Sequence, residues 1–171
     1  MDNFVSALAS MALPFKSERL HIREVQCANY LISAWAASLG EVQQQIAVQA
    51  GLDQPLAPNM GAGSVLRVEP LKYWWLQAPA PTLEPAAATV LDQSHSKAVV
   101  IIEGEASKDL LNRCIPIDLR DSAFNDGALA STVFHHVGVT VWRQADVFWL
   151  FMPRTYAQFL TESLLEIAQS L

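Results

Sequence analysis

The sequence predicts an α+β chain in which short strands alternate with helices. Residues 20–26, LHIREVQ, alternate apolar and polar side chains, which is typical of a half-buried strand. Residues 97–105, KAVVIIEGE, hold a run of β-branched residues that predicts a strand buried on both faces. The last residues, from 155 on, repeat apolar side chains with a helical period. We therefore expect two compact strand–helix–strand units in one continuous domain, at 18–90 and 91–171.

An N-terminal arm, residues 1–17, precedes these units. Phe4, Leu8, Met11 and Phe15 recur at helical spacing, so we expect a short amphipathic helix that lies on another surface. Asp2 stands where a secretory signal would carry a basic residue, and the apolar run is short, so we do not expect a signal peptide.

The first unit is predicted to contain a strand at 20–26 and then a helix at 30–39. Asn29 is a suitable N-cap for that helix, and Gly40 a suitable stop. Residues 41–50 are compatible with a second helix. Loop residues follow, then a hairpin that turns at Glu69-Pro70, and a proline-containing linker at 78–89.

The second unit is predicted as βαββα. A strand at 97–105 precedes a helix at 106–114, and a loop then ends in a turn at Asp126-Gly127. Strands at 133–144 and 147–153 are joined by a tight turn. Thr155 and Gln158 form a capping-box pattern that starts the last helix. Its predicted apolar stripe contains Tyr156, Phe159, Leu160, Leu164, Ile167 and Leu171.

The composition excludes two classes of partner. A net charge of −6 with only 11 basic residues argues against nucleic acid and against anionic membrane surfaces. Apolar residues make up 51% of the chain and charged ones 16%, which indicates an exposed apolar patch of the kind that binds proteins. Cys27 and Cys114 show no metal-ligand spacing and are typical of reduced thiols in a cytoplasmic protein.

His135 and His136 are the first candidates for chemistry. On the predicted strand their side chains point to opposite faces, so they cannot share a metal ion. His136 lies on the face of Gly138, whose missing side chain would let another backbone approach.

Other polar groups also fail to form a reaction centre. Asp92, Ser94 and His95 are too close in sequence to align as a hydrolase triad. Gly61 and Gly63 lack the third small residue of a dinucleotide motif, because Leu66 stands there. Cys114 falls at the end of a helix, where the dipole disfavours a thiolate. Asp118, Asp121 and Asp126 share a loop and are interpreted as solvated.

We therefore predict no catalytic, cofactor-binding or metal-binding residue in this chain. Trp74 and Trp75 must face opposite sides of a sheet, so both sides are covered by helices or by another protein. Tryptophan is enriched in interface hot spots. The residues predicted to contact other subunits are Phe4, Leu8, Trp74, His136 and Trp142.

The order of several motifs resembles the gamma subunit family of heterotetrameric sarcosine oxidase. The motifs cover residues 18–169 and are most specific in the second half. An Asp-x-Ser-His turn precedes an apolar strand, and a Cys-x-x-x-Asp-Leu passage follows a helix. The matching positions are Asp92, Ser94, His95, Cys114, Pro116, Asp118, Leu119, Thr132, His136, Trp142, Arg143, Pro153, Arg154, Thr155 and Tyr156. Val133 replaces an arginine of the family, and Glu69-Pro70 replaces a Gly-Pro pair.

The resemblance implies properties that composition does not show. The fold would be related to the folate-binding domain of glycine-cleavage T-proteins. The partners would be an alpha, a flavin-bearing beta and a small delta chain, which would hold FAD, FMN, NAD and tetrahydrofolate. This chain would be a structural subunit of a complex that demethylates sarcosine or a similar amine. The alternative is a stand-alone folate-binding protein or aminomethyltransferase-related module.

Overall fold

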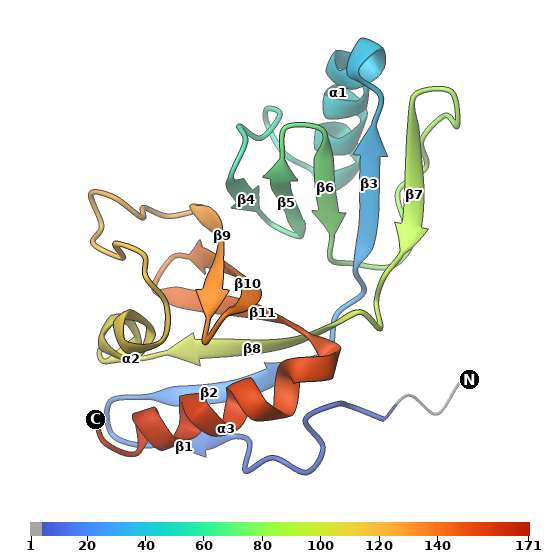
Figure 1. The fold of residues 1–171 in the computed structure, drawn as a ribbon. Coiled ribbons are helices and arrows are strands. Elements are labelled where there is room, and N and C mark those ends of the chain that lie inside the picture. The colour runs from blue at the N-terminus through green and yellow to red at the C-terminus, as the bar shows by residue number, and fades with distance from the viewer. Residues whose placement is uncertain (1–4) are drawn as a thin grey trace. The chain divides into compact units, whose positions relative to one another are not determined.

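The computed structural model describes residues 5–171 and contains two compact units (Figure 1). The first unit is built from the residues up to Gln26, His95–Asp126 and Ser131–Leu171, and the second from Cys27–Ser94 and Gly127–Ala130. Neither unit is continuous in sequence, because strands distant in the chain pair with each other. The boundary predicted between residues 90 and 91 falls inside a strand.

The first unit has a six-stranded sheet in the order β1-β2-β8-β11-β10-β9. The pairs that β8 makes with β2 and β11 are antiparallel, and so is the pair of β10 with β11. The strands are β1 (Phe15–Lys16), β2 (His21–Val25), β8 (Lys97–Glu103), β9 (Leu129–Phe134), β10 (Val137–Gln144) and β11 (Val147–Pro153).

The apolar residues of β8 place this strand in the middle of the core. Ile22, Ile102 and Phe148 lie opposite one another on three adjacent strands and are almost fully buried. Helices α2 (Ser107–Cys114) and α3 (Ala157–Ala168) complete the unit, with Leu110 and Leu164 fully buried. The predicted strands at 20–26 and 97–105 and the helix at 106–114 are confirmed.

The second unit has a five-stranded sheet in the order β4-β5-β6-β3-β7, with antiparallel neighbours. Helix α1 (Leu39–Ala50) packs on one face, where Val42 and Ile46 meet Ile32, Tyr73 and Trp75. The strands are β3 (Tyr30–Ala34), β4 (Met60–Ala62), β5 (Val65–Glu69), β6 (Lys72–Trp75) and β7 (Ala88–Asp92). The hairpin predicted at Glu69-Pro70 joins β5 to β6 and is confirmed.

The helix predicted at 30–39 is wrong. Residues Tyr30–Ala34 form β3, which lies between β6 and β7 and pairs with both. Short apolar runs are ambiguous between the two structures, and pairing on both sides favours the strand. Gly40 does not stop a helix either, because it lies inside α1. That helix ends instead at Gly51, whose φ of 67° is the left-handed C-cap conformation.

The single strand predicted at 133–144 is also wrong. β9 ends at Phe134 and β10 begins at Val137, so His135 and His136 form the turn between them. Both have positive φ, 49° and 78°. A two-residue hairpin turn with two positive φ angles suits the twist of the adjoining strands. The alternation argument applied to these histidines therefore does not hold.

The arm and the start of the last helix differ from the prediction as well. Residues 7–10 form turns rather than a helix, and Phe4 lies outside the described residues. The described arm follows the first unit: Arg154 donates to the Val5 carbonyl at 2.7 Å, and Gln158 to Ser10 at 3.3 Å. A 3₁₀ turn (Arg154–Tyr156, η2) precedes α3, and no side chain caps the helix, so the predicted capping box is absent.

Candidate functional site

Three of the predicted interface residues lie inside the chain. Leu8 is 2% exposed, Trp74 is 8% exposed and Trp142 is completely buried. Trp142 lies opposite Trp149 across β10 and β11, with ring centroids 5.3 Å apart. These three side chains fill the interior, so they do not enter the candidate surface. Phe4 is outside the described residues, whereas His136 is exposed.

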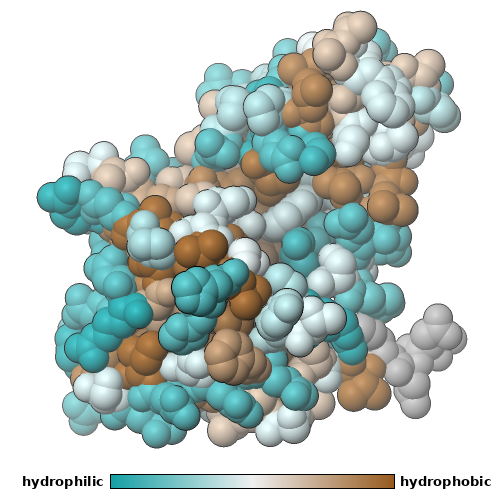
Figure 2. All heavy atoms as spheres, in the orientation of Figure 1, coloured by the Kyte–Doolittle hydropathy of each residue, from teal (hydrophilic) through white to brown (hydrophobic). Residues whose placement is uncertain are grey.

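The exposed apolar residues of the first unit include a group near the β9–β10 hairpin. Figure 2 shows hydrophobic side chains, in brown, around this hairpin. His135 contacts Phe159 of α3 with ring centroids 5.9 Å apart. We call this group the hairpin patch, and it consists of His135, His136, Tyr156 and Phe159.

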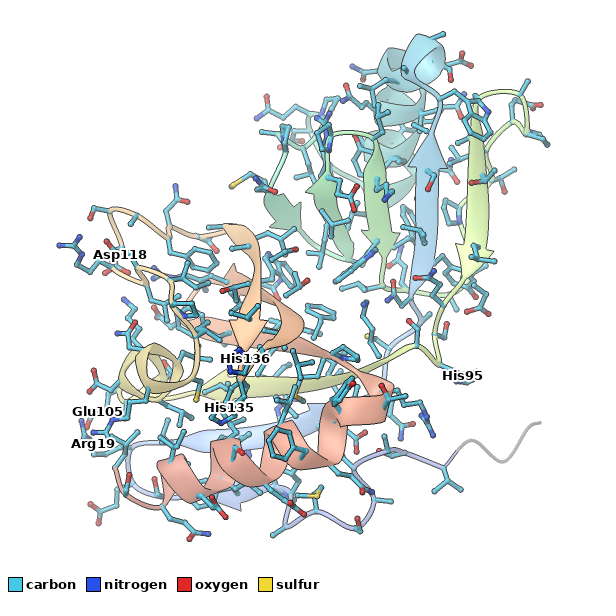
Figure 3. The ribbon with its side chains drawn as sticks, in the orientation of Figure 1. Arg19, His95, Glu105, Asp118, His135 and His136 are labelled. Carbon is cyan, nitrogen blue, oxygen red and sulfur yellow. The ribbon has the colours of Figure 1, made fainter. Side chains whose placement is uncertain are left out.

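The hairpin patch combines aromatic area with hydrogen-bonding groups. Tyr156 and Phe159 are 52% and 53% exposed, which is unusual for large side chains next to a well-packed core. The strand turn and α3 supply the two sides, and Figure 3 shows both imidazoles at the tip of the hairpin. Imidazole and phenol groups both donate and accept hydrogen bonds. The arrangement therefore suits contact with a protein surface that is partly polar.

The sequence places Tyr156 and Phe159 in the apolar stripe of the last helix, so their exposure was not predicted. The buried residues of this helix are instead Ala157, Leu160, Thr161, Leu164, Leu165 and Ala168. The small residues Ala157 and Thr161 could have indicated the buried face, because they recur with the leucines at helical spacing.

The carboxylates of the loop after α2 are bound to neighbouring groups. Arg120 donates to Asp118 at 2.9 Å and holds the pKa of that carboxyl down at about 2. Lys108 and Arg143 both donate to Asp121 and lower its pKa. Asp126 accepts from the Ala145 backbone N–H at 2.7 Å. Asp121 and Asp126 therefore tie the loop to its surroundings, whereas Asp118 pairs within the loop, so the prediction that all three are merely solvated is incomplete.

Arg143 is the centre of that arrangement. Its side chain is 10% exposed and donates to the carbonyls of Phe124 and Ala145, both at 2.8 Å, as well as to Asp121. A buried guanidinium is tolerated when its N–H groups are satisfied in this way. Arg143 thus fastens the loop to β10, the second strand of the β9–β10 hairpin.

Ser94 is held by a local turn. Its hydroxyl donates to Asp92 at 2.6 Å and accepts from the Asn29 backbone N–H at 3.1 Å. The Ser94 backbone N–H also donates to Asp92, so these residues form an Asx turn. The hydroxyl proton therefore points to a carboxylate, which is the geometry of a structural serine.

The two cysteines are poor nucleophiles. Burial raises the pKa of the Cys114 thiol to about 12 and also raises the pKa of Cys27. The dominant cause is loss of hydration rather than the helix dipole that the sequence suggested. Both thiols are free in the structure.

The described residues offer no assembled ion site. Among residues 5–171, no group of three His, Cys, Asp or Glu side chains lies close enough to hold a metal ion. Gly61 lies in β4, and Gly63 forms the turn into β5 with a φ of 59°. In the same part of the chain no helix is long and apolar enough to cross a membrane.

These features define an α+β chain with two antiparallel sheets and an exposed aromatic patch beside a hairpin. The fold is that of a solved chain from the heterotetrameric sarcosine oxidase of Corynebacterium sp. U-96, in complex with pyrrole 2-carboxylate. The TM-score is 0.82 at 22% identity, over 98% of this chain and 95% of that one. The fold class predicted from the sequence is thereby confirmed.

The chain is similar in sequence to the gamma subunits of sarcosine oxidase, which confirms the resemblance found in the motifs. It is 26% identical to the gamma subunit of an Arthrobacter species over 126 residues. These residues make up 72% of this chain and 62% of the relative. It is 27% identical to the gamma subunit of Corynebacterium sp. strain P-1 over 124 residues, which make up 71% of this chain and 61% of that relative. The matched region thus spans about three-fifths of these relatives. No model of a known protein family matches the sequence.

Proposed function

We propose that this chain is the non-catalytic gamma-type subunit of a sarcosine-oxidase-type flavoprotein complex. The complex would oxidatively demethylate sarcosine or a similar N-methyl amine. The role of this chain is assembly: it presents a folded surface to alpha, beta and delta partners. The observation that carries the proposal is the agreement of fold and sequence with gamma subunits, together with the hairpin patch.

The chemistry of the polar groups supports a structural role. Ser94 donates to Asp92, Asp118 and Asp121 are paired with basic side chains, and burial keeps Cys114 protonated. These four groups, all of types found in catalytic sites, therefore serve the fold. The reacting groups of the complex would then belong to its other chains.

The cofactors belong to the same proposal. FAD, FMN, NAD and tetrahydrofolate would be bound by the partner subunits, and the complex would be cytoplasmic. The relatives are named as subunits, which supports this role over a stand-alone folate-binding protein. The relation of the fold to the folate-binding domain of T-proteins is part of this proposal.

Co-expression with the alpha, beta and delta chains of the same organism tests the proposed function. The wild-type chain should co-elute with them in one peak that carries flavin absorbance. The double variant Tyr156→Ser/Phe159→Ser should leave that peak, because it removes two exposed aromatic side chains from the hairpin patch. Glu162→Ser changes an exposed polar residue of the same helix and is the matched control.

Two outcomes would contradict the proposal. One is a wild-type chain that elutes as a monodisperse monomer in the presence of all three partners. The other is tight binding of tetrahydrofolate by the isolated chain in calorimetric titration, which would favour the folate-binding alternative.

A further inference from the structure

The sheet of the second unit has two edge strands, β4 and β7, and among the described residues only β4 makes backbone hydrogen bonds to a further segment. The β4 edge is covered by the chain itself: Gly61 donates to the Gly127 carbonyl at 2.8 Å, and Leu129 to the Asn59 carbonyl at 3.0 Å. Met60 and Ala128 form an antiparallel bridge there. Proteins commonly close edges in this way, because an open edge invites pairing with another strand.

On the opposite edge, β7 pairs with no further strand of residues 5–171. It is the last strand of the sheet in Figure 1, and its residues from Thr89 to Asp92 are all exposed. Val90 and Leu91 are 36% and 57% exposed. The strand, ATVLD, contains no proline and no lysine, the residues that usually protect such an edge.

The register shows which backbone groups point outward. Gln93 donates to the Asn29 carbonyl at 2.8 Å, and Trp35 donates to the Ala87 carbonyl at 3.0 Å. In an antiparallel pair the bonded residues alternate, so odd-numbered residues of β7 bond to β3. Val90 lies between the odd-numbered residues Thr89 and Leu91, and it faces Ile32 in a pair without backbone hydrogen bonds. Its N–H and C=O therefore point away from the sheet.

We propose that β7 is a docking edge to which an extended segment of a partner subunit adds as a further strand through the Val90 backbone. This inference rests on the proposed function, because the partner is a chain of the same complex. A strand of five residues is about 17 Å long. Pairing of two copies along it would bury far less than the roughly 1,200 Å² of a stable interface. The incoming strand thus belongs to a chain that is also held elsewhere.

The side chains of β7 set the chemistry of the incoming strand. Val90 lies on the α1 face and Leu91 on the opposite face, so apolar residues on either face of the new strand would extend the sheet. Asp92 ends β7, and an acidic residue directly opposite it would be repelled. We therefore expect a short β-branched segment that carries a neutral or basic residue at one end.

Val90→Pro tests the docking edge. Proline removes the outward N–H but no bond to β3, since Val90 does not pair with β3 through its own N–H. The folded chain should survive, and its binding to the partners should weaken about five- to tenfold. Val90→Thr keeps the N–H and a similar shape, so it should bind like the wild type. Circular dichroism checks that both variants are folded.

Hydrogen exchange in the wild-type complex gives a second measurement. The Val90 amide should exchange quickly in the free chain and slowly in the complex, whereas the Leu91 amide should be protected in both. The inference fails if the wild type assembles and Val90→Pro assembles equally well. It also fails if the Val90 amide exchanges equally fast in the free chain and in the complex. A wild type that does not assemble overturns the proposed function and this inference together. A homodimer that Val90→Pro abolishes would assign the edge to a second copy.

Discussion

His135 and His136 occupy the two central positions of the β9–β10 turn, both with positive φ. Asn, Asp and Gly adopt this conformation more readily than histidine, so the turn is not optimised for stability. Both histidines are nevertheless exposed, at the turn of the hairpin. This is where a group that contacts a partner would be placed.

The double variant His135→Asn/His136→Gly should stabilise the isolated chain. Asn-Gly is the preferred sequence of this turn, so we expect the free energy of unfolding to rise by about 1 kcal/mol. Urea denaturation followed by circular dichroism measures the change. His136→Val, which places a β-branched residue at positive φ, should lower stability instead. Equal stability of all three proteins would contradict the conformational argument.

Arg143→Met should destabilise the first unit. The variant keeps much of the apolar volume but leaves the Phe124 and Ala145 carbonyls without their donor. Loss of two such bonds at a buried site predicts a cost of about 2–3 kcal/mol. Arg120→Met removes an exposed pair with Asp118 and should leave the melting temperature unchanged. Equal effects of the two substitutions would show that the Arg143 bonds contribute little.

Gly104→Ala should destabilise the same unit through the backbone. Gly104 has a φ of 113°, and a Cβ there would lie 2.2 Å from the Arg19 carbonyl oxygen. Both the dihedral strain and the clash predict a loss of at least about 2 kcal/mol. Gly138→Ala is the matched control, because a Cβ at that position meets nothing within 4 Å. A mild effect at Gly104 would mean that the loop before α2 can move away.

The Cys114 thiol should make stability fall at alkaline pH. Its pKa is raised from 9.0 to about 12 by burial, so the folded chain favours the neutral thiol. That contribution is fully present below pH 9 and is lost as the pH rises from 9 towards 12. The slope from this one group is at most about 1.4 kcal/mol per pH unit. Cys114→Ala should flatten the alkaline limb of the stability curve relative to the wild type, and an unchanged slope would contradict the assignment.

Local patterns in the sequence predicted the elements in which β-branched or apolar residues recur along the whole length. The β-branched run of β8 and the leucines of α2 and α3 bury the same residues in almost any packing, so their type could be predicted. The resemblance to gamma subunits could be recognised from the order of the motifs, and the relatives confirm it.

The tertiary structure alone decided the features that depend on distant pairing. Tyr30–Ala34 became a strand because β6 and β7 flank it, and the histidines became a turn because β9 folds back on β10. Exposure of Phe159, burial of Trp142 and the open edge at Val90 likewise depend on which residues pack against each position. Periodicity describes one segment at a time, whereas burial and edge position are properties of the assembled sheet.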